Sequence, residues 1–294
     1  MRPPRTLSTR RRRRAAALVL TGVTFLGVAG CSGDEDPTAT ASSQPRALTQ
    51  TEAERLAVVR FRNFDAGVRS IDLVIPKTGD TDRLHVVGWY DFAEHHGYAS
   101  VTQGDKGIGV VTGDMAWSPE KIAIVSAPIS APGDAAPVGE IATDGWTTTT
   151  FDAGTSILTS ALAVIASLGS DRPENASLLQ QSDAAHLRTD TVGSASVDVF
   201  AGPSGDAASS SGATDEEADG TTASSPAAAD GSSATTTVPL EQRIAYWVDA
   251  TGVALRVDLP LSTTTAVLLL GDADPAALPD LSAIDTVLSG SDAS

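Results

Sequence analysis

The chain has 294 residues, with 20 basic and 37 acidic side chains and a formal net charge of −17. Residues 1–30 contain seven arginines and no acid, so the remainder carries 13 basic and 37 acidic side chains, net −24. Such a surface repels nucleic acid and anionic lipid headgroups, which excludes nucleic acid as a partner and membrane binding by charge alone. Cys31 is the only cysteine, so no disulfide can form within the chain, and the fold must rest on its own core.

Residues 1–30 have the pattern of an export signal. Seven arginines occur within the first 14 residues, and the apolar run Ala15–Ala29 follows. This run is short for a membrane-spanning helix. The sequence Val28-Ala29-Gly30-Cys31 is typical of a lipobox, in which the thiol receives a diacylglycerol and cleavage leaves Cys31 as the new N-terminus. We therefore expect a lipoprotein on the outer face of the cytoplasmic membrane, held there through the N-terminal lipid on Cys31.

Two alternatives concern this leader. An ordinary signal peptide, or an uncleaved helix with a chance cysteine, would give no lipid anchor. The run Arg10–Arg14 contains the arginine pair of a twin-arginine signal without the rest of that motif. Export by the Sec or the Tat pathway therefore stays open.

Residues 31–50 are rich in Asp, Thr, Ser and Pro, and they predict a flexible tether with an r.m.s. reach of roughly 25 Å. The sequence Thr51-Glu52-Ala53-Glu54 then fits a capping box. Apolar residues follow at approximately helical spacing as far as Gly67, which suits a helix end. We expect the folded domain, residues 51–270, to begin with one amphipathic helix over Thr51–Asn63.

From Val68 the apolar period changes to two, which is typical of β-strands. Strands are predicted over Val68–Ile75, Arg83–Tyr90, Tyr98–Gln103, Gly107–Thr112, Lys121–Ser126 and Trp146–Phe151. Pro76–Asp80 predicts a turn, and the Pro/Gly/Asp-rich segment Pro128–Gly145 predicts a loop.

Ala153–Ser170 contains 18 residues without a charge. A helix that is apolar on most sides is buried in protein or in lipid. Eight of these residues are Gly, Ser or Thr, which is unfavourable for a membrane span, so we expect a helix packed inside the domain. Pro173 suits the first position of a short helix that ends at Gln181. Leu187–Phe200 predicts one or two strands around Gly193.

Residues 202–238 contain six acids, no base and few large apolar side chains. This composition predicts a disordered insert. The alternating segments Ile244–Asp249 and Val253–Leu259 then predict a hairpin, with Gly252 supplying a left-handed residue in the turn. Thr263–Leu270 predicts a last strand, and residues 271–294 predict a loose acidic tail with one helical turn.

The order of these elements favours an α+β fold with a single large antiparallel sheet. A sheet of eight or more strands tends to curl, so we expect a half-barrel whose concave face is covered by helices. Ala153–Ser170 has the apolar character that such a covering helix needs.

Four features together resemble the mycobacterial LppX/LprG-type lipoproteins, which belong with the LolA and LolB lipoprotein carriers. They are the lipobox at Cys31, the early helix Thr51–Asn63, the apolar helix Ala153–Gly169 and the hairpin Tyr246–Val257 with its Trp-Val-Asp-x-x-Gly turn. The resemblance covers residues 51–270 outside the insert. An excess of arginine over lysine, with abundant Ala, Gly, Asp and Thr, indicates a GC-rich genome and agrees with an actinobacterial envelope protein.

The resemblance implies that acyl chains bind between a curved sheet and its helices, and that the protein transports or presents an envelope lipid or glycolipid. In this hypothesis the acyl cavity is lined by Leu158, Leu162, Ile165, Leu255 and Val257. The same side chains would also suit an ordinary filled core, because both environments are apolar.

We predict no catalytic residues, no metal site and no cofactor. Ser118–Lys121 matches S-x-x-K and Lys77–Gly79 matches K-T-G of penicillin-recognising enzymes, but their order is reversed and both lie at predicted turns. The adjacent His95 and His96 would point to opposite faces of a strand, so a polar turn is favoured over a metal site.

Two other functions stay open: a non-catalytic interaction or sensor module with a filled core and, less favoured, a hydrolase. A lipid carrier should contain an apolar cavity of several hundred Å³ between sheet and helix. An interaction module should instead combine a packed core with an exposed apolar patch. The sequence identifies neither the ligand nor a protein partner.

Overall fold

A computed structural model describes residues 44–76, 83–104, 110–126, 137, 139–204, 238–262 and 264–290. The leader with Cys31, residues 31–43 of the predicted tether, residues 77–80 of the predicted turn and residues 205–237 of the predicted insert lie outside the described residues. Residues 46–50 of the predicted tether belong to the fold, because Arg46 and Ala47 pair with His186 and Ala185.

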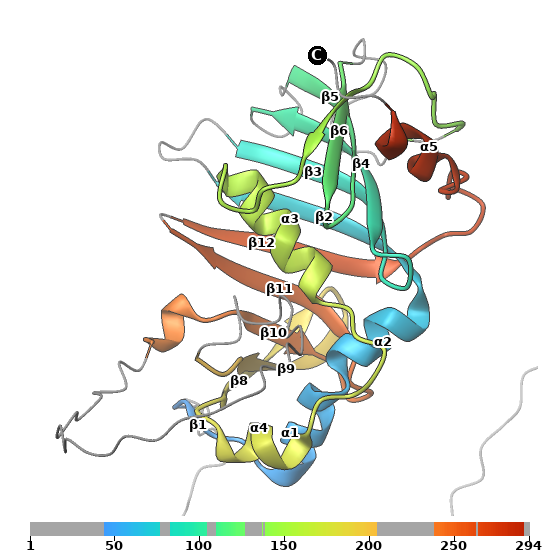
Figure 1. The fold of residues 1–294 in the computed structure, drawn as a ribbon. Coiled ribbons are helices and arrows are strands. Elements are labelled where there is room, and N and C mark those ends of the chain that lie inside the picture. The colour runs from blue at the N-terminus through green and yellow to red at the C-terminus, as the bar shows by residue number, and fades with distance from the viewer. Residues whose placement is uncertain are drawn as a thin grey trace, which may run out of the picture. The chain divides into compact units, whose positions relative to one another are not determined.

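The described strands form one antiparallel sheet in the order β1-β8-β9-β10-β11-β12-β2-β3-β4-β5-β6-β7 (Figure 1). The strand bounds are β1 (Arg46–Ala47), β2 (Val68–Pro76), β3 (Arg83–Asp91), β4 (His96–Gln103), β5 (Val110–Trp117), β6 (Lys121–Val125), β7 (Thr147–Thr150), β8 (Ala185–Val192), β9 (Ala195–Ala201), β10 (Ala245–Val248), β11 (Ala254–Leu261) and β12 (Thr264–Asp272). Within the described residues the two edge strands, β1 and β7, do not pair, so the sheet is not closed. The α+β class and the single large antiparallel sheet are therefore confirmed.

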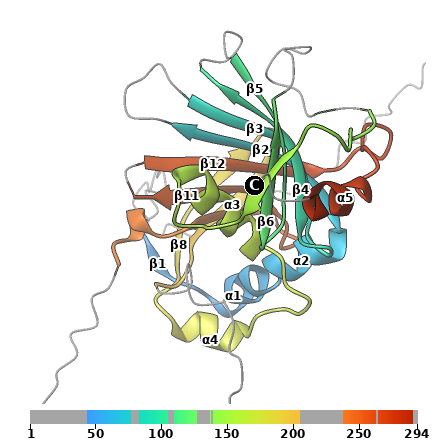
Figure 2. The same cartoon turned by 45° about the horizontal axis from the view of Figure 1, so that its top comes forward.

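The helices are few and short. They are α1 (Gln50–Ala57), α2 (Val59–Ala66), α3 (Ile157–Ser167), α4 (Ala176–Gln181), the single 3₁₀ turn η1 (Leu240–Gln242) and α5 (Ala283–Ser289). Figures 1 and 2 show α3 crossing one face of the sheet, where it contacts β11, while α1 and α4 lie side by side near β8, and α2 leads from α1 to β2. No helix in the described ranges is long and apolar enough to cross a membrane.

The main hydrophobic core lies between α3 and the sheet. Leu162 and Ile165 are fully buried there against residues such as Leu73, Val257 and Leu268. Burying a Leu or Ile side chain contributes about 1.5–3 kcal/mol, so this face fixes the helix on the sheet. The helix predicted over Ala153–Ser170 is thus packed inside the domain, but it spans only Ile157–Ser167, because Ser156 caps its start.

The first helix begins earlier than the sequence predicts and is broken once. The capping box is formed by Thr49 and Glu52, not by Thr51 and Glu54. The Glu52 carboxylate accepts from Thr49 N (2.9 Å) and from the guanidinium of Arg46 (2.7 Å), which favours this earlier start. A break at Val58 divides the helix into α1 and α2, and Gly67, with φ +63°, ends α2 as predicted.

Two other predicted elements are shifted. The described part of the strand predicted over Gly107–Thr112 belongs to β5, which continues to Trp117. The second half of β5 is buried on both faces of the sheet: Met115 and Trp117 belong to the main core, and Ala116 belongs to a second cluster. This half therefore lacks the alternation of polar and apolar residues that marks a strand with one exposed face. Pro173 does not begin α4, since Asn175 caps that helix by accepting from two backbone N–H groups.

The predicted loose tail is folded over much of its length. Leu281, Ile284, Val287 and Leu288 are buried in a second cluster with Trp89 of β3. Trp89 and Tyr90 are neighbours on β3 and point to opposite faces, so α5 packs on the face opposite to the main core. The apolar spacing of i, i+3, i+6 and i+7 is helical, and the acidic composition of the segment concealed it.

Candidate functional site

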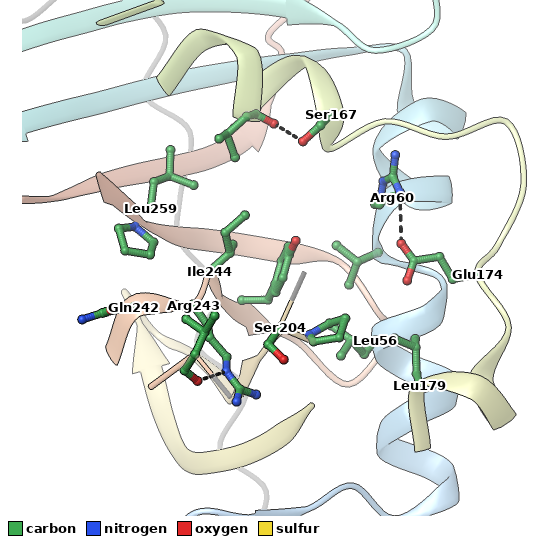
Figure 3. Close-up of a pocket in the computed structure, with 17 residues that line it drawn as sticks. Leu56, Arg60, Ser167, Glu174, Leu179, Ser204, Gln242, Arg243, Ile244 and Leu259 are labelled. Atoms are coloured by element: carbon green, nitrogen blue, oxygen red, sulfur yellow. Dashed lines mark hydrogen bonds and ion pairs between the residues drawn. The ribbon is translucent and has the colours of Figure 1, made fainter. Parts of the chain in front are cut away.

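A pocket of about 310 Å³ lies where the helices meet the β9–β11 part of the sheet (Figure 3). Its wall comes from α1, α2, the end of α3, α4 with the segment before it, strands β10 and β11, and the residues that follow β9 and precede β10. The apolar part of the lining consists of Leu56, Val59, Val164, Leu179, Pro203, Val238, Ile244, Tyr246, Leu259 and Pro260. A concave, mostly apolar surface with a few polar groups is typical of a small-molecule site.

The positions of the apolar lining residues within their helices and strands explain why their side chains meet at the pocket. Leu56 and Val59 are three residues apart across the break between α1 and α2, so they share one side of the helix pair. Val164 lies two residues after the fully buried Leu162, so it is only half-buried, and it packs against the margin of the main core while it lines the pocket. Ile244, directly before β10, and Tyr246 on β10 are two residues apart, and both line the pocket.

A buried polar network fixes the end of α3 beside this pocket. Asn63 Nδ2 donates to the carbonyl of Leu168 (2.8 Å), and its Oδ1 accepts from Arg69 Nη1 (2.7 Å). Arg69 Nη1 also donates to Ala254 O (3.0 Å). The network joins α2, the end of α3, β2 and β11, so the wall of the pocket is rigidly supported.

One rim of the pocket carries an ion pair. Arg60 Nη1 lies 3.2 Å from Glu174 Oε1, and the two side chains are 29% and 33% exposed. Ser170 N donates to Arg60 O (3.2 Å), and Glu174 N donates to Ala57 O (2.9 Å). The segment between α3 and α4 is therefore held along α2.

The other rim is built around Arg243. Its side chain is 4% exposed, and it donates to Val238 O (2.8 Å) and Asp183 O (2.7 Å) while Nη2 lies 2.9 Å from Asp183 Oδ2. The Asp183 carboxylate also accepts from Ser204 N (2.9 Å) and from the Ser204 hydroxyl. Burial of the Asp183 carboxylate raises its pKa. The hydrogen bonds from Ser204 and the charge of Arg243 outweigh this effect and hold the pKa of Asp183 below its ordinary value. Ser204 and Val238, which flank residues 205–237, are thus fixed by one ion pair.

None of the five residues predicted to line an acyl cavity lines this pocket. Leu162, Ile165 and Val257 are fully buried in the main core, and Leu158 packs against the edge of that core. Leu255 lies on the other face of the sheet, in a cluster with Val197, Val199 and Trp247.

A β-bulge explains why Leu255 and Val257 do not share a face. Trp247 pairs with Arg256, but the next residue, Val248, pairs with Ala254, so Leu255 has no partner on β10. A bulge of this kind turns the side chain of the extra residue away from regular alternation. Leu255 therefore joins Arg256, whose guanidinium lies 4.2 Å from the Trp247 ring, on the outer face.

The motifs weighed for catalysis and metal binding have structural roles where they are described. The Ser118 hydroxyl accepts from the backbone of Glu120 and Lys121 in the β5–β6 turn. His95 lies in the β3–β4 turn with φ +56°, and His96 begins β4, with its Nδ1 3.8 Å from Asp285. Within the described ranges, no three His, Cys, Asp or Glu side chains are placed to hold a metal ion. The K-T-G match at Lys77–Gly79 lies outside the described residues.

A further polar cluster, which sequence patterns did not indicate, joins α1 to the sheet. Asp198 on β9 accepts from Arg55 (2.6 Å), Thr189 (2.9 Å) and the His186 imidazole (3.1 Å). Burial raises the pKa of Asp198, but these hydrogen bonds outweigh that effect and hold the pKa below its ordinary value. Because Asp198 accepts from side chains of α1 and β8, the cluster connects these elements to β9.

Comparison with protein-family models gives no match, and comparison with curated proteins gives none either. The similarity to the LppX/LprG-type lipoproteins therefore remains an expectation based on the pattern and order of elements.

Proposed function

We propose that this chain is a non-enzymatic lipoprotein, anchored through Cys31 outside the cytoplasmic membrane, that binds an acyl chain of an envelope lipid or glycolipid. The observation that carries the proposal is the apolar pocket of about 310 Å³ between the helices and the sheet. Its volume lies at the small end of the range for sites that hold one small molecule. The pocket therefore suits one chain better than the several chains of a large lipid.

The proposal assigns the ligand to the sheet face that carries α3. In this proposal that face is the concave face of a half-barrel, and α1–α4 form its cover. The acyl chain enters beside α3 and does not pass beneath it, because Leu162 and Ile165 fill the space under that helix. The predicted cavity residues thus support the fold, and the lining listed above binds the ligand.

The distribution of exposed apolar side chains favours a carrier over an interaction module. In the described residues, the large exposed apolar side chains are Ile124 on β6, Leu178 on α4 and Leu269 on β12. They lie on separate elements and are single residues, which is ordinary for a soluble surface. A docking module would need such side chains gathered in one patch.

Native mass spectrometry of the full chain, purified from its own membranes, tests the proposal. We expect a population heavier than the covalently lipidated chain by the mass of one amphiphile. The extra mass should leave on collisional activation and be absent under denaturing conditions, because only the covalent anchor survives there. A chain that always carries the anchor alone, at any protein concentration and in mild detergents, would contradict the proposal.

A further inference from the structure

The two arginines that line the pocket use their donors differently. Arg243 has all three side-chain nitrogens engaged with Val238 and Asp183, at distances between 2.7 and 2.9 Å. Arg60 has five N–H donors, but Nη1 is 3.2 Å from Glu174, Nη2 is 3.5 Å from Gly169 O, and the buried Nε has no partner in the part of the chain that the structure describes. Within the described residues, Arg60 therefore has one side-chain nitrogen without a partner, whereas each side-chain nitrogen of Arg243 has one.

Arg60 also stands where the head of a bound amphiphile would lie. It is partly exposed at the rim and directly follows the apolar Val59 of the lining. Figure 3 shows Arg60 and Glu174 together at one side of the pocket, with Gln242 and Arg243 on the other. A chain that occupies the apolar lining would thus place its polar end within reach of a guanidinium.

The charged side chains of the lining form two ion pairs: Arg60 with Glu174, and Arg243 with Asp183, which lies outside the lining. A guanidinium is suited to the paired oxygens of a carboxylate or phosphate. Resting on the proposed function, we infer that the pocket selects single-chain amphiphiles with an anionic head, and that Arg60 binds this head.

The contact with Glu174 gives the inference a second, opposite prediction. An anionic head competes with the Glu174 carboxylate for the same guanidinium. Removing the charge of Arg60 should therefore weaken binding of an anion, and removing the charge of Glu174 should strengthen it. Neither substitution should change the binding of an amphiphile that has the same chain length and a neutral head.

The test measures occupancy of the full chain by native mass spectrometry in one detergent, with four dodecyl probes. The probes are dodecanoate, dodecyl phosphate, dodecanol and dodecyltrimethylammonium. For Arg60→Gln we expect binding of both anions to fall about tenfold, because a hydrogen bond to a charged group is lost. Glu174→Gln should raise their binding several-fold. The matched control is Arg62→Gln, on the same helix but exposed and outside the pocket, and it should change nothing.

The outcomes separate the inference from the proposed function. Equal binding of dodecanol and the anions, unchanged in Arg60→Gln, would overturn the headgroup inference and leave acyl-chain binding intact. Failure of every probe to bind the wild type would overturn both. If Arg60→Gln lowers the melting temperature, Arg60→Lys is measured as well, because it keeps the positive charge. This variant should retain most of the anion binding, and loss of anion binding in Arg60→Lys would contradict the inference. The two anion probes show whether carboxylate or phosphate is preferred.

Discussion

Leu162 and Val164 are two residues apart on α3, yet their surroundings differ. Leu162 is fully buried between the helix and the sheet, whereas Val164 is half-buried and lines the pocket. Added volume at these two positions should therefore have different effects. A packed core resists a larger side chain, and an open pocket accepts one at the expense of its ligand.

We expect Leu162→Trp to lower the free energy of unfolding by about 1–3 kcal/mol or more, because the core has no room for the indole. Thermal or denaturant unfolding of the variant measures this. Leu162→Met, which nearly conserves volume, is the control and should cost less than about 1.5 kcal/mol. An unchanged melting temperature together with lost ligand would show that Leu162 faces a cavity after all.

Glu52 links the first helix to β1 and should make stability depend on pH. Its hydrogen bond from Arg46, with those from Thr49, outweighs burial and lowers the pKa of Glu52 from 4.5 to about 2. The folded state thus favours the carboxylate, so this contribution is present above about pH 4.5 and is lost as the pH falls toward 2.

Glu52→Gln should therefore lower the free energy of unfolding by about 1–3 kcal/mol near pH 7 and reduce its decline below pH 4.5. Urea unfolding at a series of pH values measures both effects. Glu54→Gln changes the same type of charge on an exposed face of the same helix and should have little effect. Equal losses in the two variants would argue against the role of the Arg46–Glu52 pair.

At the scale of elements, α5 extends the folded domain beyond the last strand. Ile284 is fully buried in the cluster that joins α5 to the sheet. We expect Ile284→Ala to cost about 2–4 kcal/mol, the usual range for a truncated core side chain. Thr286→Ala, on the exposed side of α5, should cost almost nothing. If thermal unfolding shows no difference between the two variants, α5 does not contribute to the core.

Most strands were predictable because one face of each is buried and the other is not. In β2 the burial alternates from Val68 to Pro76, which is the period-two pattern that the sequence displays. The prediction was less accurate where both faces are covered, as in the second half of β5. The tail was predicted to be loose from its acidic composition, but four apolar residues at helical spacing fold it onto the sheet.

The binding site could not be predicted from the sequence in the same way. Its lining comes from six or more separate segments, and only the tertiary structure brings Leu56, Val164 and Leu259 together. Because the cavity residues on α3 were predicted from their apolar character alone, the prediction selected residues that fill the core. The bulge at Leu255 is invisible in a regular alternation, so the face of that side chain was predicted wrongly.

At the scale of the whole molecule, membrane attachment and ligand binding are assigned to different parts of the chain. Attachment is assigned to the lipid on Cys31, and binding to the pocket in the described domain. Two acyl chains on one residue are sufficient for stable membrane attachment, so the domain needs no other hold on the bilayer.

Cys31→Ser should abolish incorporation of an alkyne-tagged fatty acid and leave either an unprocessed precursor or a released domain. Metabolic labelling followed by fractionation of membranes measures both. The anchor prediction fails if the variant still takes up the label at the wild-type level. Ligand binding by a released domain should persist, because the pocket lies far along the chain from Cys31.

The most direct test of the central claim places a large side chain in the pocket. Val164→Trp fills space in the lining, whereas Ala163→Trp adds a still larger volume at a partly exposed neighbour that belongs neither to the pocket lining nor to the core clusters. The measurement is the fraction of each full chain that carries a non-covalent amphiphile in native mass spectrometry, with the melting temperature measured alongside. We predict that Val164→Trp loses most of the ligand at a nearly unchanged melting temperature and that Ala163→Trp keeps it. Equal ligand occupancy in the wild type and both variants would contradict the assignment of acyl-chain binding to this pocket.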